Sequence, residues 1–199
     1  MPENKLDVHS EMTPEALMLS LREVIGQLSR VYQPNRDRVV TPDNVFQPSV
    51  EAGRDILEAY QHRLFKAGSR VEGLEHLEHC LGELAQGRQV LFLPEHRGNF
   101  DVPSFNALLR KENPRYHTIL ERLVYIAGRK LNESSDLVKM FSEKYARLVI
   151  VPRRELPGVQ PGETPADTER RLAYESEASR INRAAFRLSV FITSTAALT

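Results

Sequence analysis

The 199-residue sequence has a single cysteine, no net charge of either sign and no long apolar run. The lone Cys80 excludes an intramolecular disulfide framework and favours a reducing compartment. Lys plus Arg (27) balance Asp plus Glu (27), so no overall positive field favours a nucleic-acid partner. The start, MPENKLDVHSEMTPEA, mixes charges without an apolar centre, and no later run reaches membrane-spanning length. We therefore expect a cytoplasmic protein without a signal peptide, while peripheral membrane contact stays open.

Three helical patterns precede residue 88. The first begins at Thr13 and Pro14, an N-cap and first-turn pair. Its apolar residues recur at spacings of three and four, at Leu17, Leu21, Val24, Ile25 and Leu28. A second helix is expected from about Ser49 to Gly68, and a third over residues 71–85. Residues 1–87 therefore predict an N-terminal helical bundle.

From residue 88 onward, short apolar runs alternate with helical patterns, which is typical of βαβ units. The predicted strands are QVLFLP (89–94), LVYIAG (123–128) and RLVIVP (147–152), and their continuous apolar character favours burial on both faces. A Pro- and Gly-rich loop and a long helix follow, and the tail SVFITSTAALT could begin another strand. Residues 88–199 therefore predict an α/β domain with a mostly parallel sheet flanked by helices.

His96 and Asp101 stand on either side of the turn from the first predicted strand to a helix, where α/β folds usually bind ligands. A neutral imidazole removes a proton from a hydroxyl only if one ring nitrogen is free. A carboxylate bonded to the other nitrogen fixes that tautomer. Gly98 allows the backbone to reverse between the two residues. The alternative is a loop histidine next to a carboxylate at a helix N-terminus.

The segment HRGNFD (96–101) resembles the first signature of the glycerolipid acyltransferases, a His-x4-Asp motif that follows a strand. Downstream, YIAGRKL and MFSEKYARLVIVPRREL are similar in order and spacing to the soluble glycerol-3-phosphate acyltransferases. The resemblance implies transfer of a fatty acyl group from an acyl thioester, on coenzyme A or acyl carrier protein, to a hydroxyl of glycerol 3-phosphate or a related acceptor in phospholipid synthesis. His96 would be the general base and Asp101 its orienting carboxylate. This chemistry needs positioning and oxyanion stabilisation, with no metal and no cofactor beyond the acyl donor.

Arg153 and Arg154 follow the predicted strand 147–152, so we expect them at the same end of the sheet as His96. Guanidinium groups bind phosphate bidentately, which makes this pair the candidate ligand for the acceptor phosphate. The alternative is a solvated pair beside Glu155. Arg97, next to the candidate base, is a further candidate for substrate contact or for a solvent-facing role.

The family's third block, a Gly- and Arg-containing phosphate-binding motif, has no counterpart after Asn182. The predicted α/β domain is therefore expected to be incomplete at its C-terminus. This leaves a second function open, that of a catalytically inactive or truncated module that binds acyl chains or acyl carrier protein. A hydrolase that uses Ser104 as nucleophile is disfavoured, because DVPSF lacks the glycines of a nucleophile elbow.

A metal site is not expected, although His76, His79 and Cys80 are close together in LEHLEHC. The leucines of this segment form its core stripe, which leaves the histidines on flanking or solvent-exposed faces. No second cluster of ligands is evident in the sequence.

Overall fold

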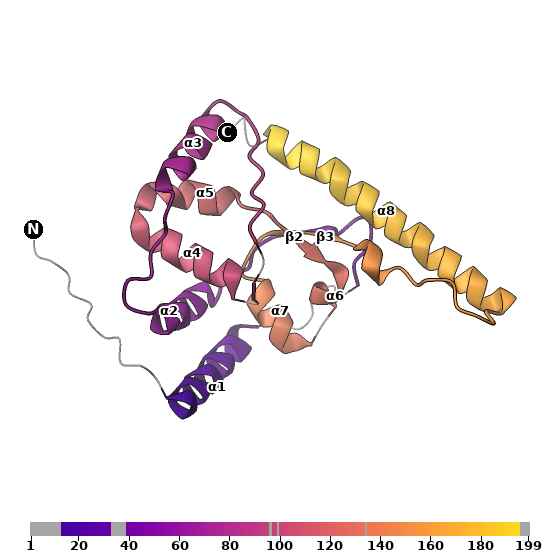
Figure 1. Cartoon of the computed structure of the whole chain (residues 1–199), viewed down its shortest axis with the longest axis horizontal. Coiled ribbons are helices and arrows are strands. Elements are labelled where there is room, and N and C mark those ends of the chain that lie inside the picture. Colours follow the sequence, from indigo (N-terminus) through magenta and orange to yellow (C-terminus); the bar gives the residue numbers. More distant parts are fainter. Residues whose placement is uncertain (1–12, 33–38, 96, 99, 134, 196–199) are drawn as a thin grey trace, which may run out of the picture.

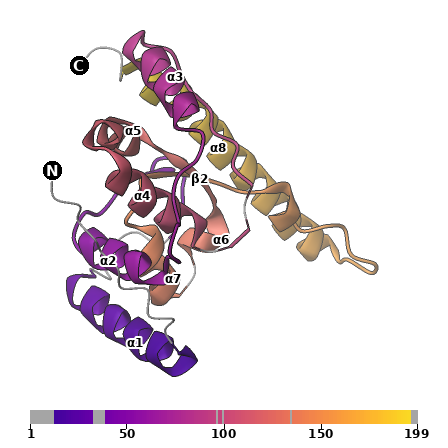
Figure 2. The ribbon, with the colours of Figure 1, turned by 60° about the vertical axis from the view of Figure 1, so that its left-hand side comes forward.

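The computed structural model describes residues 13–32, 39–95, 97–98, 100–133 and 135–195 (Figure 1). The α-helices are α1 (Pro14–Val31), α2 (Arg54–Leu64), α3 (Leu74–Ala85), α4 (Asp101–Glu112), α5 (His117–Arg122), α6 (Arg129–Asn132), α7 (Asp136–Ser142) and α8 (Pro165–Thr195). The strands are β1 (Phe46–Gln47), β2 (Tyr125–Gly128) and β3 (Arg147–Ile150), and the 3-10 helices are η1 (Pro114–Tyr116) and η2 (Arg153–Glu155). Helices surround a small sheet, and α8 runs along one side of the molecule (Figures 1 and 2).

The prediction of an α/β fold with a mostly parallel sheet is wrong. The structure is 60% helical and contains a small three-stranded mixed sheet in the order β1-β3-β2. Two of the predicted strands form, as β2 and β3, and they pair in parallel from Tyr125 opposite Arg147 to Gly128 opposite Ile150. The third strand, β1, comes from the segment between the first two predicted helices and pairs antiparallel with β3.

The predicted strand 89–94 has no regular secondary structure in the described chain. The side chains of Leu91 and Leu93 are 73% and 86% exposed, whereas Phe92 packs against the cluster formed by α3, α4 and α5. An apolar run becomes a strand only if another strand accepts and donates its backbone hydrogen bonds. Since β2 pairs with β3 and with no other described strand, this run lacks that partner.

The helix predictions hold better, because helix ends are set by local signals. Thr13 caps α1 by accepting a hydrogen bond from the Ala16 amide at 3.2 Å. The second helix begins at Arg54, later than predicted, since Gly53 adopts a positive φ of 82° just before it. A Cβ at Gly53 would lie 2.9 Å from a methyl group of Leu28, so the glycine also allows close contact with α1. The tail expected to begin a strand continues α8 as helix to Thr195.

Three apolar clusters hold these elements together. The first packs α8 on the sheet, the second joins α3 to α4, η1 and α5, and the third joins α1, α2 and α7. The helix α3, from the predicted N-terminal region, thus shares its core with helices that follow residue 88. The division into residues 1–87 and 88–199 stays a prediction.

A fully buried charged pair joins α2 to the turn between α7 and β3. The Lys144 ammonium donates to Glu143 Oε1 at 2.9 Å and to the Ala52 carbonyl at 2.7 Å. The backbone completes the junction, because the Val50 amide donates to the Glu143 carbonyl and Arg54 Nε donates to the Lys144 carbonyl. Buried charges require such partners, so this junction fixes the approach of α2 to the sheet.

Tyr125, the first residue of β2, and Tyr145, two residues before β3, have ring centroids 6.0 Å apart. Burial raises the pKa of Tyr125 to about 12, and a hydrogen bond from Asn106 Nδ2 at 2.6 Å partly opposes the shift. Burial also raises the pKa of Tyr145, and the negative charge of Glu58 adds to that rise. Both hydroxyls therefore stay neutral in the folded protein at pH values where an exposed phenol ionises.

Replacing Lys144 by Met should lower the free energy of unfolding by about 3–5 kcal/mol, because Glu143 is then a buried charge without its partner. The double variant Glu143→Gln, Lys144→Met should recover part of that loss. Lys66→Met, at an exposed lysine, is the control and should change stability by less than about 0.5 kcal/mol. Urea unfolding followed by circular dichroism measures all three, and equal effects of the two lysine variants would contradict the buried pair.

The free energy of unfolding should fall as the pH rises from 10 towards 12, because the unfolded chain ionises its tyrosines while Tyr125 stays protonated in the folded state. This contribution is fully present below pH 10 and is lost as the pH rises through the raised pKa. Each such group contributes a slope of up to about 1.4 kcal/mol per pH unit. Tyr125→Phe should lose less stability than the wild type when the free energy of unfolding of each protein is compared with its own value at pH 8. The difference in slope should correspond to one ionising group. Urea titrations at several alkaline pH values test this, and an unchanged slope would refute it.

Candidate functional site

The carboxyl ends of β2 and β3 lie side by side, because the two strands are parallel and in register through Gly128 and Ile150. The helix α6 leaves the first strand at this edge, and η2 leaves the second. A Cβ at Gly128 would lie 3.2 Å from Glu155 Oε1 and 3.3 Å from Pro152 Cγ. The absence of a side chain at Gly128 therefore allows η2 to fold against the end of β2.

Arg153 and Arg154 occupy η2 at this edge. Their expected position at the same end of the sheet as His96 stays a prediction, because His96 lies outside the described residues. Both side chains are exposed, and neither guanidinium has an ion pair with any residue that the structure describes. Glu155 points inward instead, and its Oε2 is buried without a hydrogen-bond partner in the described chain. Two cations are thus available to a ligand from solvent.

The turn before α4 is held by the carboxylate of Asp101. Its Oδ2 accepts hydrogen bonds from the backbone amides of Arg97 at 2.6 Å and Gly98 at 2.9 Å. Asp101 is the first residue of α4, where a carboxylate is also stabilised by the helix dipole. Its counterpart in the motif, His96, lies outside the described residues, so the predicted bond between them stays a prediction.

Arg97 points to a neighbour within the same loop. Its guanidinium donates to Glu95 Oε2 at 2.9 Å, and the two side chains are 80% and 73% exposed. An exposed ion pair of this kind contributes little to stability. The contact holds the charge of Arg97 close to that of Glu95, and neither bonds to the arginines of η2.

The 97–101 turn and the strand edge belong to different elements that meet through α7. Phe100, at the start of α4, packs edge-to-face on Phe141 of α7 with ring centroids 6.3 Å apart. The helix α7 in turn contacts α6, which leaves the end of β2. No hydrogen bond or ion pair in the described ranges joins Asp101 to Arg153 or Arg154. The predicted residues therefore lie on adjoining elements without direct contact between the two groups.

A third arginine at this edge, Arg129, follows β2 directly and is surrounded differently from Arg153 and Arg154. Its side chain is buried and lies 4.6 Å above the ring of Tyr174. It also lies 3.7 Å from Glu133 and 4.0 Å from Glu177. The sequence could have indicated the contact with Glu133, which lies four residues later. It could not have indicated the contacts with Tyr174 and Glu177 of α8. Arg129 therefore joins the strand edge to α8 and is not exposed to a phosphate.

The remaining candidates lie away from this edge. Ser104 donates from Oγ to Gln61 Oε1 at 3.0 Å, so its hydroxyl faces α2. The side chains of His76 and His79 are 85% and 78% exposed on α3, next to Glu75 and Glu83 respectively. No group of three or more potential metal ligands occurs in the part of the chain that the structure describes. Nor does any described helix combine the length and apolar character needed to cross a membrane.

Comparison with known proteins gives no relative. No family model, no curated protein sequence and no solved structure matches this chain.

Proposed function

We propose that this protein is an acyltransferase that moves a fatty acyl group from acyl-CoA or acyl carrier protein to a hydroxyl of glycerol 3-phosphate or a related acceptor. The observation that carries the proposal is the Asp101 carboxylate, which binds the two backbone amides that follow His96. The carboxylate of the His-x4-Asp motif is thereby bonded to the backbone of the residues that come next after His96 in the sequence. Such an enzyme would act in phospholipid synthesis, in the cytoplasm, with peripheral contact to membrane lipids.

The reaction requires a base, a positioned acceptor and a stabilised oxyanion. His96 takes the proton from the acceptor hydroxyl, and the oxygen attacks the thioester carbonyl carbon. The tetrahedral intermediate collapses as its carbon–sulfur bond breaks, and the proton passes from His96 to the leaving thiolate. Asp101 orients the imidazole and stabilises its protonated form, as carboxylates do in comparable pairs.

Arg153 and Arg154 bind the phosphate of the acceptor in this proposal. Their guanidinium groups are exposed and carry no ion pair in the described chain, so binding breaks no existing bond. They follow β3 at the carboxyl edge of a parallel pair of strands, where α/β units commonly bind anionic ligands. Arg97 is less suited to this role, because Glu95 already binds its guanidinium.

The second candidate is a catalytically inactive or truncated module that binds acyl chains or acyl carrier protein. It is favoured by the exposure of Leu91 and Leu93, two large apolar side chains that precede His96 in the sequence. Such a module needs an apolar surface and not the imidazole. Turnover by the purified protein distinguishes the two candidates.

Replacing His96 by Ala should lower acyl transfer from a thioester to glycerol 3-phosphate by about 100-fold or more, because general-base catalysis contributes at least that factor. His76→Ala, at an exposed histidine of α3, is the matched control and should leave turnover unchanged. Circular dichroism on both variants shows that the fold is retained. Transfer that survives in a folded His96→Ala variant would sink the proposed base, and no transfer by the wild type would favour the binding module.

The double variant Arg153→Gln, Arg154→Gln should raise KM for glycerol 3-phosphate by about 10-fold or more, since each charged hydrogen bond to phosphate is worth about 1.5–3 kcal/mol. KM for the acyl donor should stay the same. Arg70→Gln, at an exposed arginine paired with Glu72, serves as the control. Steady-state kinetics with each substrate varied in turn measures the split. A change in both KM values, or in neither, would argue against a phosphate site at η2.

A further inference from the structure

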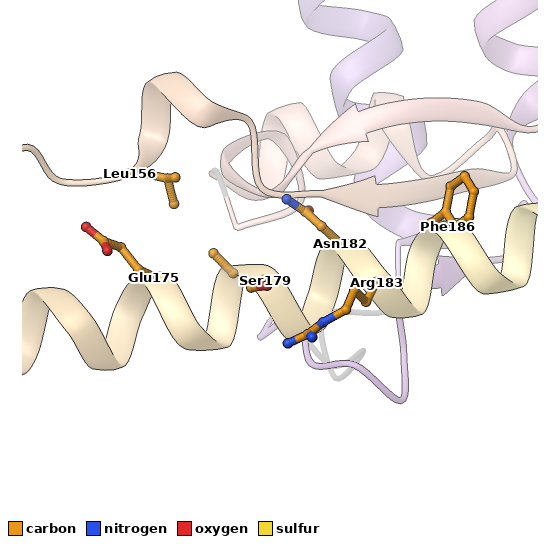
Figure 3. A pocket seen from close by; sticks show the side chains of 7 residues that line it. Leu156, Glu175, Ser179, Asn182, Arg183 and Phe186 are labelled. Carbon is orange, nitrogen blue, oxygen red and sulfur yellow. The ribbon is translucent and has the colours of Figure 1, made fainter.

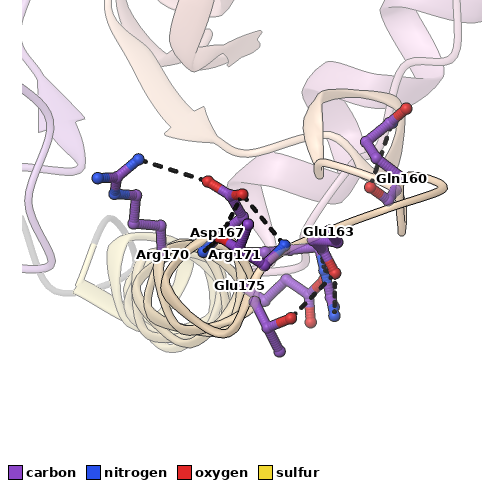
Figure 4. A network of polar contacts seen from close by, with 9 residues as sticks. Gln160, Glu163, Asp167, Arg170, Arg171 and Glu175 are labelled. Carbon is purple, nitrogen blue, oxygen red and sulfur yellow. Dashed lines mark hydrogen bonds and ion pairs between the residues drawn. The ribbon is translucent and has the colours of Figure 1, made fainter.

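The arginines in the first half of α8 are paired with nearby carboxylates. Arg171 donates to Glu163 at 3.1 Å and to Glu175 at 3.2 Å, and Arg170 lies 3.5 Å from Asp167 (Figure 4). These hydrogen bonds to the carboxylates of Glu163 and Glu175 raise the pKa of Arg171, so the guanidinium stays charged. This part of the helix therefore presents paired charges to solvent.

The second half of α8 carries unbalanced positive charge. Arg180, Arg183 and Arg187 are exposed, and none forms an ion pair with a residue in the described ranges. The sequence from Ala178 to Thr199 contains no Asp or Glu. Spacings of three and four residues set the three arginines on one face of the helix, over a length of about 10 Å. We call these three residues the arginine face.

The arginine face points away from the sheet, because the opposite side of α8 is packed. Ala178, Ile181 and Ala185 are buried against the core over β3. Asn182 points to the end of the strand, where its amide binds both backbone groups of Val151, while Arg183 points away from the strands (Figure 3). Since α8 runs along the outside of the molecule, a flat surface can reach this face (Figures 1 and 2).

Apolar surface adjoins the arginines. The ring of Phe186 is 71% exposed and lines a groove of ≈350 Å³ together with Leu156, Ala178 and Arg183 (Figure 3). A second groove, of ≈380 Å³, lies where Arg187 and Leu188 of α8 face Phe46 of β1. Basic side chains beside an exposed aromatic ring can bind a membrane surface from outside, through attraction to anionic lipids and a shallow apolar contact.

We propose that the arginine face docks on an anionic lipid surface, with the three guanidinium groups on lipid phosphates and Phe186 at the interface. Charge complementarity carries the argument, because three unpaired cations on one helix face match a surface of closely spaced anions. A planar lipid surface matches their linear arrangement on an outer helix. Nucleic acid is less suited, since a duplex phosphate backbone offers no apolar region for the exposed ring of Phe186. The proposal does not depend on acyl transfer and would hold for a protein that only binds lipid.

The expected affinity follows from the electrostatics of membrane surfaces. Each Arg near an anionic surface strengthens binding by about fivefold, so three together contribute about 100-fold. The contribution falls with salt, because the screening length shrinks from about 8 Å at 0.15 M to about 3 Å at 1 M ionic strength. Binding to zwitterionic vesicles should therefore be weak at any salt concentration.

The test is co-sedimentation of the full chain with vesicles of phosphatidylcholine alone and with 30% phosphatidylglycerol. The wild type should bind the anionic vesicles and release them at high salt. Arg180→Gln, Arg183→Gln, Arg187→Gln should lower that affinity by about 100-fold. The matched control, Arg70→Gln, Arg115→Gln, Arg170→Gln, removes the same charge from arginines that are paired with acids, and should lower it by less than about fivefold. Glutamine keeps helix propensity, and circular dichroism confirms the fold.

A second variant separates the apolar contact from the charges. Phe186→Ser should weaken binding to anionic vesicles without changing its salt dependence. Equal loss in the two triple variants would overturn the proposal, because net charge alone would then explain binding. Equal binding of the wild type to both vesicle types would overturn it too. If the wild type bound neither kind of vesicle, the proposal would also be overturned. That result would include the case in which the arginine face binds an acidic protein such as acyl carrier protein.

Discussion

The burial of Lys144 is the constraint on which the arrangement of α2, α7 and β3 depends. An ammonium group removed from water must find oxygen partners, and it finds them in Glu143 and in the carbonyl of Ala52. The segment before α2 must therefore lie against the turn before β3. The helix α2 then packs on α4, so the place where α4 begins, at Asp101, follows from a charge buried elsewhere. The internal ion pair thus contributes, through α2, to the position of α4.

The sequence predicted helices better than it predicted the sheet, for a physical reason. Helix signals are local, so Thr13 and Pro14 indicate the start of α1 without reference to the rest of the chain. A strand depends on a partner from elsewhere, and the apolar run 89–94 looked like the runs that became β2 and β3. It stays irregular because no described strand pairs with it, whereas the two-residue β1 formed in a segment with little strand signal. The sheet is therefore smaller than the apolar runs of the sequence predict.

The candidate site shows the same division between local and distant information. The place of Arg153 and Arg154 at the end of β3 could be read from their position after an apolar run, and Asp101 from its place in a first helical turn. The burial of Arg129 could not be read from the sequence, because Tyr174 and Glu177 contact it only after α8 has packed against the strand edge. Arginines that look equivalent in sequence are thus divided by tertiary contacts into buried and solvent-exposed groups.

The side-chain amide of Asn182 acts as a substitute for a neighbouring strand at Val151, the residue that follows the sheet's central strand β3. It accepts from the Val151 amide at 2.7 Å and donates to the Val151 carbonyl at 2.9 Å. A shift of α8 by one residue would rotate this side chain by about 100° and move it about 1.5 Å, breaking both bonds. The helix is therefore locked in a single axial register against the strand. The loop over residues 156–164 can then change in length or sequence during evolution without altering how far the arginines of α8 lie from those of η2.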